Sequence, residues 1–200
     1  MNNKKRLVLS LLVLVLLIAC AYVLYNQIQG GIDTQQLSVS EEPVANDEVK
    51  ETPDAEGAKD EKAKAPDFTA LDADGNEVQF YDYLGKPIVL NFWASWCGPC
   101  QMEMPEFEEA YKNYGDKINF LMVNMTDGSR ETVDTASEFI STSGYTFPVF
   151  YDTEQQAAYG YGVYSLPTTY FLDAEGYAIA SAMGAINAET LQKGIDMILP

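Results

Sequence analysis

Histidine is absent from this 200-residue sequence, and cysteine occurs only three times, as Cys20, Cys97 and Cys100. A structural zinc site takes four ligands, which are drawn from cysteine, histidine and carboxylate side chains. Cys20 lies in an apolar segment far from the other two cysteines, and no histidine is present to complete a site with them. Zinc binding is therefore disfavoured, which leaves the pair as either inert buried residues or a redox-active dithiol.

Basic residues are also scarce, because 12 lysines and arginines stand against 30 acidic residues, for a net charge of −18. Residues 1–32 carry +3, residues 33–66 carry −6 and residues 67–200 carry −15. A domain this acidic repels a phosphate backbone, which argues against nucleic acid as a partner. It favours basic partners over neutral ones, although a strongly acidic surface also serves solubility alone.

Large apolar residues are almost missing between residues 26 and 64, where Gly30-Gly31 is followed by glutamate, alanine, aspartate, lysine and proline. Such a segment cannot bury enough apolar surface to form a core. We therefore expect a disordered acidic linker over residues 26–64.

The N-terminus, in contrast, holds one long apolar run. Residues 1–6 hold three basic residues, Lys4, Lys5 and Arg6, and no acid, and residues 7–25 are apolar except for Ser10. A helix of this length spans about 28 Å, close to the roughly 30 Å of a bilayer's hydrocarbon core. Basic residues ahead of the run place the N-terminus in the cytoplasm. We expect residues 7–25 to be a transmembrane signal anchor, with the rest of the chain outside the cytoplasm.

Cys20 leaves a second form of anchoring open. Leu17-Ile18-Ala19-Cys20 has the form of a bacterial lipoprotein signal, in which Cys20 becomes the lipidated first residue of the mature protein. Residues 21–25 remain apolar, however, whereas a lipidated N-terminus usually enters a polar tether at once. The transmembrane anchor is therefore preferred, with a lipoprotein or simple secretion as alternatives, and all three place the domain outside the cytoplasm.

Strands and helices are expected to alternate in residues 65–200, which form one domain. A hairpin is predicted where two short apolar segments flank residues 72–76, which have hairpin-turn chemistry. The strands are expected at residues 68–71, 77–80, 88–94, 118–125, 147–151, 168–172 and 177–183. The helices are expected at residues 101–114, 130–143, 155–159 and 188–199. Buried strands joined by helices imply βαβ crossovers, so the pattern predicts an α/β fold.

Two cysteines at the spacing of Cys97 and Cys100 can open and close one disulfide. The predicted strand at residues 88–94 delivers Cys97 to the start of a helix, where unpaired backbone N–H groups favour the thiolate. Cys100, one turn later, can reach back to disulfide distance. Pro99 suits the first helical turn, and Gly98 leaves the backbone open to a partner. We therefore expect Cys97 to be the exposed attacking thiol and Cys100, deeper in the helix, to be the resolving thiol.

The sequence NFWASWCGPC at residues 91–100 resembles the thioredoxin superfamily, and Pro105 matches the helix-kinking proline found there. Three further segments resemble the membrane-anchored TlpA/ResA-like branch of thiol–disulfide oxidoreductases, namely APDF at 65–68, CQMEMP at 100–105 and LPTTYFLD at 166–173. The resemblance covers the chain from about Ala65 onward. It implies a thioredoxin fold, in which helices flank a central mixed sheet, with an N-terminal β-hairpin and an inserted strand–helix before residue 166.

The resemblance also implies roles for residues around the dithiol. Trp96 precedes the first cysteine, and Pro167 is expected to follow a cis peptide bond, to pack against the disulfide and to present backbone groups to an extended substrate. An ordinary trans Leu-Pro turn is the alternative. Tyr159, Tyr161 and Tyr164 lie just upstream. They are either part of the same groove or ordinary packing residues.

Asn91 departs from cytoplasmic thioredoxins, which keep a buried acid at this position to take the proton of the resolving cysteine. An amide cannot accept that proton. Glu103, one turn after Cys100 on the same helix face, could replace the acid, and the matching glutamate of the ResA-like branch lies beside the active site. The alternative is that Glu103 is a surface glutamate stabilised by the helix N-terminus.

These features together predict an extracytoplasmic, membrane-tethered thiol–disulfide oxidoreductase with no cofactor besides its Cys97–Cys100 disulfide. The Gly98–Pro99 pair is the one that reducing thioredoxins carry, so reduction of disulfides in exported proteins is favoured. The family implies electrons from a membrane thiol carrier of the CcdA/DsbD kind. It also implies a substrate such as an apocytochrome c haem-binding pair, an oxidised methionine sulfoxide reductase or another secreted protein.

Three other functions are alternatives to this one. A disulfide-forming oxidant is the nearest alternative, and a non-catalytic tethered binding module is another. A peroxidatic enzyme is disfavoured, because Leu90 and Ala94 stand where such enzymes carry the proline and threonine that activate their cysteine.

Overall fold

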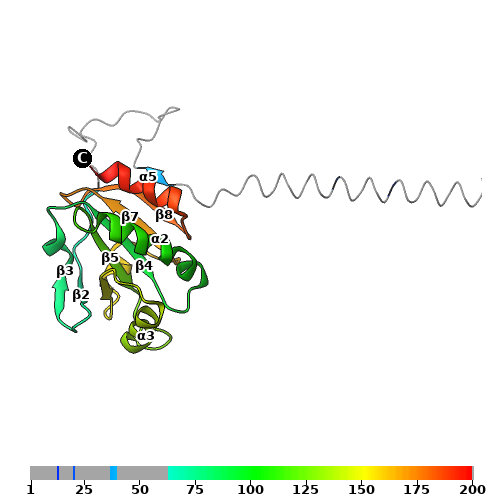
Figure 1. Cartoon of the computed structure of the whole chain (residues 1–200). Helices are drawn as coiled ribbons and strands as arrows, with labels where there is room; N and C mark the ends of the chain where they lie inside the picture. Colours follow the sequence, from blue (N-terminus) through cyan, green and yellow to red (C-terminus); the bar gives the residue numbers. More distant parts are fainter. Residues whose placement is uncertain (1–12, 14–19, 21–36, 40–62, 200) are drawn as a thin grey trace, which may run out of the picture. The chain divides into compact units, whose positions relative to one another are not determined.

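One mixed sheet organises the described part of the chain, which comprises residues 13, 20, 37–39 and 63–199 of a computed structural model. The described strands follow the order β1-β8-β7-β4-β5-β6-β2-β3 (Figure 1). Their bounds are β1 Ser38–Val39, β2 Thr69–Leu71, β3 Glu77–Gln79, β4 Ile88–Trp93, β5 Asn119–Asn124, β6 Val149–Tyr151, β7 Thr168–Leu172 and β8 Ala178–Met183. The β4–β5 and β5–β6 pairs are parallel and the other pairs are antiparallel. The predicted thioredoxin-like α/β fold, with its β2–β3 hairpin, is confirmed.

β4 lies at the centre of the sheet, and the Cys97–Cys100 dithiol follows its carboxyl end. All six of its residues are buried, because the strand is covered on both faces. It runs antiparallel to β7, with Phe92 opposite Thr168. The carboxyl end of β4 therefore lies beside the amino end of β7. This register brings together two motifs that are far apart in the sequence, the dithiol that follows β4 and Pro167, which precedes β7.

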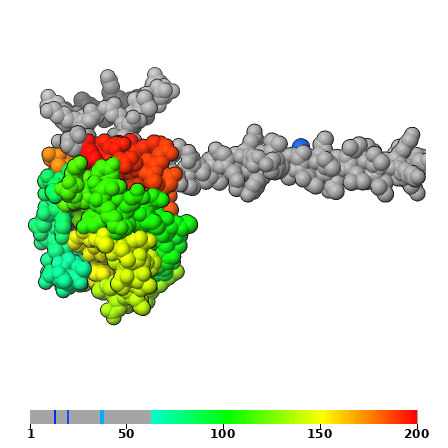
Figure 2. Space-filling view, viewed as in Figure 1, coloured from blue at the N-terminus to red at the C-terminus, as the bar shows by residue number. Residues whose placement is uncertain are grey.

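Helices cover both faces of the sheet. Their bounds are α2 Gly98–Tyr114, α3 Val133–Ser143, α4 Gln156–Gly160 and α5 Ala188–Ile198, with a 3-10 helix η1 at Phe80–Tyr83. Alternate residues of β4 enter different clusters: Val89 and Trp93 pack with residues of α2, α3 and α5, whereas Leu90 and Phe92 pack with residues of η1 and α4. In the space-filling view α5 (red) lies against α2 (green), and the two helices are in contact (Figure 2).

The sequence of elements agrees with expectation except in two places. η1 was not predicted. β1 lies inside the segment that was expected to be a disordered linker, so that expectation is wrong for Ser38–Val39, which pair with Ser181 and Ala180 of β8. β1 is thus part of the sheet although it precedes residue 65, the predicted start of the domain.

The predicted anchor lies almost entirely outside the described residues. Residues 1–34 form a separate unit, of which only Val13 and Cys20 are described. Both are exposed, and Cys20 is a free cysteine. Among the described residues, no helix has the length and apolarity needed to cross a membrane. Most of the linker expected over residues 26–64 also lies outside the described residues.

Candidate active site

Cys97 and Cys100 form a disulfide at the start of α2, with their Cα atoms 5.2 Å apart. Cys97 is the N-cap of the helix, and its Sγ accepts a hydrogen bond from the backbone N–H of Cys100 at 3.2 Å. Pro99 occupies the first helical turn, where a missing N–H leaves no hydrogen bond unmade. A Cβ added to Gly98 would meet no atom within 4 Å, so the backbone is open there. The predicted strand–dithiol–helix arrangement is confirmed.

The two sulfurs differ in access. Cys97 keeps 5% of its surface exposed in the disulfide form and lines a surface groove, whereas Cys100 is fully buried. Cys97 is therefore the more accessible cysteine, as predicted, although it is much less exposed than the sequence led us to expect.

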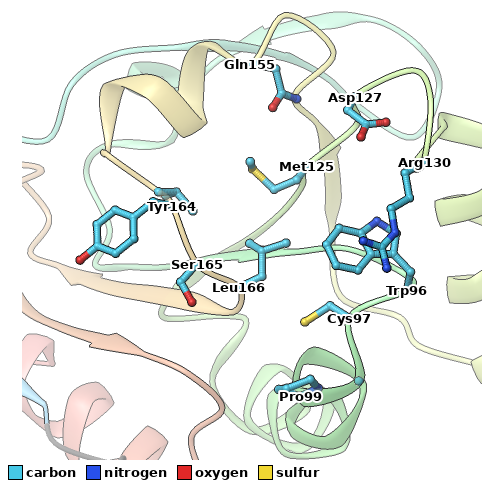
Figure 3. Close-up of a pocket in the computed structure, with 12 residues that line it drawn as sticks. Trp96, Cys97, Pro99, Met125, Asp127, Arg130, Gln155, Tyr164, Ser165 and Leu166 are labelled. Atoms are coloured by element: carbon cyan, nitrogen blue, oxygen red, sulfur yellow. The ribbon is translucent and has the colours of Figure 1, made fainter.

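The groove beside Cys97 has a volume of about 490 Å³. Figure 3 shows Cys97 at one end of it, beside Trp96, whose ring lies under the guanidinium group of Arg130. The groove is lined by side chains from four parts of the chain, namely Trp96, Cys97, Gly98, Pro99, Met125, Asp127, Arg130, Gln155, Val163, Tyr164, Ser165 and Leu166. Its lining combines apolar and aromatic side chains with one acid and one cation.

The peptide bond between Leu166 and Pro167 is cis, as the resemblance predicted. Pro167 is buried, and its carbonyl accepts a hydrogen bond from the N–H of Gly184 at 2.8 Å. Leu166 lines the groove, so the cis bond lies at the groove's edge. The role of Pro167 toward a substrate stays a prediction.

Of the three upstream tyrosines, one lines the groove, one packs in the core and the third does neither. Tyr164 lines the groove and is 83% exposed. Tyr161 packs against Phe92 and Tyr170 in the core. Tyr159 is exposed but does not line the groove.

Glu103 lies on the buried side of α2, one turn after Cys100, and is only 2% exposed. Its carboxylate accepts hydrogen bonds from Asn91 Nδ2 at 2.8 Å and from the N–H of Ile186 at 2.9 Å. Burial raises the pKa of Glu103 to about 7, because the loss of water disfavours the charged form more than these two hydrogen bonds favour it. The alternative of a surface glutamate is therefore wrong.

Asn91 is fully buried below the dithiol on β4. Its Nδ2 also donates to Thr169 Oγ1 at 3.0 Å, and its Oδ1 has no hydrogen-bond partner in the described part of the chain. Asn91, on the sheet, thus orients the carboxylate of Glu103. Cytoplasmic thioredoxins have an acid at the position of Asn91, whereas here that position holds an amide that donates a hydrogen bond to an acid on α2.

Several groove and loop residues have no role in the sequence-based prediction, among them Asp127, Arg130, Glu131 and Gln155. Arg130 had a detectable signal, because no other basic residue occurs between Lys117 and Lys193. Glu131 had none, since it is one of many glutamates and its contacts depend on the tertiary fold. The described residues contain no group of three or more cysteine, histidine, aspartate or glutamate side chains placed to hold a metal ion.

Known proteins resemble this chain in sequence and in structure. Residues 62–180 match the AhpC/TSA family. The thiol–disulfide oxidoreductase ResA of Geobacillus thermodenitrificans is 32% identical over 202 residues, and the match covers all of both chains.

Two solved structures share the fold at comparable identity. A DsbF homologue from Corynebacterium diphtheriae has a TM-score of 0.60 and 29% identity, covering 74% of this chain and 99% of that one. The exposed lipoprotein thioredoxin Etrx1 from Streptococcus pneumoniae has a TM-score of 0.56 and 32% identity, covering 66% of this chain and 99% of that one. This chain belongs to the AhpC/TSA family and is a ResA-like thiol–disulfide oxidoreductase with a thioredoxin fold.

Proposed function

We propose that the protein reduces disulfides in exported proteins, with Cys97 as the attacking thiol and Cys100 as the resolving thiol. The observation that carries this assignment is the difference in access: Cys97 lines the groove and Cys100 is fully buried behind it. The position of Cys97 at the N-terminus of α2 stabilises its thiolate, because the helix dipole and the N–H of Cys100 both favour negative charge there.

The reaction transfers two electrons in two exchange steps. The Cys97 thiolate attacks one sulfur of the substrate disulfide, and the other substrate sulfur leaves as a thiolate. The Cys100 thiolate then attacks Cys97 Sγ, which releases the second substrate thiolate and forms the Cys97–Cys100 disulfide. The substrate is reduced and the enzyme is oxidised, so a second thiol protein must reduce the enzyme before the next cycle.

Glu103 is suited to manage the proton of Cys100 in the second step. Its pKa of about 7 means that it exists in both protonation states near neutral pH. Glu103 lies on the same helix as Cys100, and hydrogen bonds from Asn91 and Ile186 hold its carboxylate in place. Glu103 therefore takes the proton from Cys100 as the mixed disulfide is resolved, the role that Asn91 cannot fill.

The proposed setting is the outer face of the cell membrane. The apolar run at residues 7–25 supports a transmembrane anchor, and the match to ResA extends over the whole chain. Under this proposal a membrane thiol carrier of the CcdA/DsbD kind supplies electrons. Apocytochrome c and methionine sulfoxide reductase are examples of protein disulfide substrates. The Streptococcus pneumoniae relative is described as an exposed lipoprotein, which keeps lipid attachment at Cys20 as the alternative anchor.

The order of the two cysteines predicts different reactivity. In single-cysteine variants, Cys97 should be alkylated faster and with a pKa below the roughly 8.5 of a free thiol, whereas Cys100 should react slowly. Cys97→Ser should abolish reduction of insulin disulfides, and Cys100→Ser should accumulate mixed disulfides at Cys97. Faster alkylation of Cys100 at lower pH would reverse the assignment, and an inactive wild-type protein would favour a binding module.

Glu103→Gln should slow resolution by about 10²-fold, the usual loss when a general base is removed. The wild-type rate should rise as pH increases through about 7, because only the ionised carboxylate accepts a proton, and the variant should lack this rise. The variant should also lower the pKa of at least one cysteine, since an ionised carboxylate disfavours a neighbouring thiolate. The second phase of thiol release, after reaction of the reduced protein with an aromatic disulfide, measures resolution.

Glu109→Gln is the matched control, because Glu109 is an exposed glutamate on the same helix. It should behave as the wild type in both measurements. If Glu103→Gln also gave wild-type rates and cysteine pKa values, Glu103 would have no part in proton transfer.

The transmembrane anchor and the lipid anchor predict different masses for the membrane-extracted protein. An uncleaved N-terminus is expected, because the apolar run continues past Cys20. Intact-mass measurement distinguishes the two anchors. A mature protein that begins at Cys20 and carries a diacylglycerol group would show that the lipoprotein alternative is correct.

A further inference from the structure

Two consecutive residues of the loop between β5 and α3 contact two consecutive residues of the turn that carries the dithiol. Glu131 binds Ser95, and Arg130 stacks on Trp96. These are the two residues that precede Cys97. The proposed exchange steps assign no role to either Arg130 or Glu131.

Glu131 is completely buried and holds Ser95 through both carboxylate oxygens. Oε1 accepts from the N–H of Ser95 at 2.8 Å, and Oε2 accepts from Ser95 Oγ at 2.7 Å. Asn124 Nδ2 donates a third hydrogen bond to Oε1 at 2.7 Å, and the side chain of Gln101 donates to the carbonyl of Ser95. A buried carboxylate needs such donors in place of water. The turn before Cys97 is therefore fixed to β5 and to α2 at one residue, Ser95.

The loop that presents Glu131 is itself held by internal hydrogen bonds. Asp127 Oδ1 accepts from the N–H groups of Ser129 and Glu131 at 2.7 and 2.9 Å. The N–H of Gly128 donates to the carbonyl of Glu131 at 2.9 Å, and Gly128 has a φ of 71°, a conformation that favours glycine. The loop is thus a defined support for both residues.

Arg130, in the same loop as Glu131, stacks on the ring of Trp96. Its guanidinium carbon lies 3.5 Å from the ring centroid, within the range of a cation–π contact (Figure 3). Trp96 remains 42% exposed and lines the groove next to Cys97. Arg130 is also the one basic residue among those that line the groove. The contact therefore orients an exposed aromatic side chain in the groove beside Cys97.

We propose that Arg130 and Glu131 are positioning residues for disulfide exchange: Glu131 fixes the turn at Ser95, and Arg130 fixes the Trp96 wall of the groove. This inference rests on the proposed attack by Cys97 from that groove. Neither residue touches the reacting sulfurs. They act by holding the groove and the attacking cysteine in one geometry, which lowers the cost of ordering the complex.

Arg130→Ala should raise KM for insulin disulfides by about two- to fivefold, the factor expected from an exposed cation–π contact, and should change kcat less. Arg130→Lys should fall between this variant and the wild type. Lys117→Gln is the control for loss of one positive charge, because Lys117 is exposed and lies outside the groove. It should leave KM unchanged. A wild-type KM in Arg130→Ala, or an equal rise in Lys117→Gln, would overturn the role of Arg130.

Acrylamide quenching of tryptophan fluorescence measures how far Arg130 shields the ring of Trp96, and it does not depend on enzymatic activity. Trp93 is completely buried, so quenching reports on Trp96. Arg130→Ala should increase quenching, and Lys117→Gln should not. Unchanged quenching in Arg130→Ala would overturn the proposal even if the wild-type protein reduced no disulfide. Absence of wild-type reductase activity with increased quenching would instead overturn the proposed function while supporting the stack.

Substitutions of Glu131 separate its hydrogen bonds from its charge. Glu131→Gln should keep kcat/KM within about twofold, because Oε1 still accepts from Ser95 and Asn124 and the new amide can donate to Ser95 Oγ. Glu131→Ala should lose at least about tenfold, since it leaves buried donors unpaired. Glu138→Ala, at an exposed position on α3, is the control and should match the wild type.

Equal losses in Glu131→Gln and Glu131→Ala would show that the charge matters and would overturn the positioning role. If Glu131→Ala fails to fold, Ser95→Ala tests the same contact, because it removes only the Oγ donor. Its kcat/KM should fall by about two- to tenfold, the effect of one hydrogen bond. A wild-type value in Ser95→Ala would then contradict the proposal.

Discussion

The burial of one carboxyl group, that of Glu103, links the scaffold to the chemistry. It joins three parts of the fold, because the side chain comes from α2 and its hydrogen-bond donors come from Asn91 on β4 and from Ile186, just before α5. Two hydrogen bonds do not fully replace water, so the group has a raised pKa. A residue that fixes the active-site helix to the sheet is for the same reason able to exchange a proton near neutral pH.

A second buried glutamate, Glu131, contacts the turn before Cys97 and has a different set of hydrogen-bond donors. Glu131 receives three hydrogen bonds from Ser95 and Asn124, and under our proposal it holds the turn in place. Glu103 receives two hydrogen bonds and, under our proposal, carries a proton. Under these proposals Glu131 positions the attacking cysteine, whereas Glu103 accepts the proton of the resolving cysteine.

Much of the fold could be predicted from local sequence, because its elements have strong periodic patterns. The continuous apolar run of β4 and the dithiol motif after it were sufficient to place Cys97 at a helix start. Local sequence left Glu103 either beside the active site, as the resemblance implied, or on the surface. Its hydrogen-bond partners and the contacts of Arg130 could not be predicted, since they depend on which strands pair and which loops meet. β1 was missed for the same reason: two residues in a polar segment form a strand only because β8 offers them an edge.

Glu103 is a buried carboxyl group with a pKa near neutrality, and it lies one helical turn after Cys100. The most direct test is a carbon-13 NMR titration of the Glu103 carboxyl in the oxidised protein, with Glu103→Gln used to assign the signal. We expect a midpoint at about 7. A midpoint near 4.5, the value of an ordinary glutamate, would contradict it.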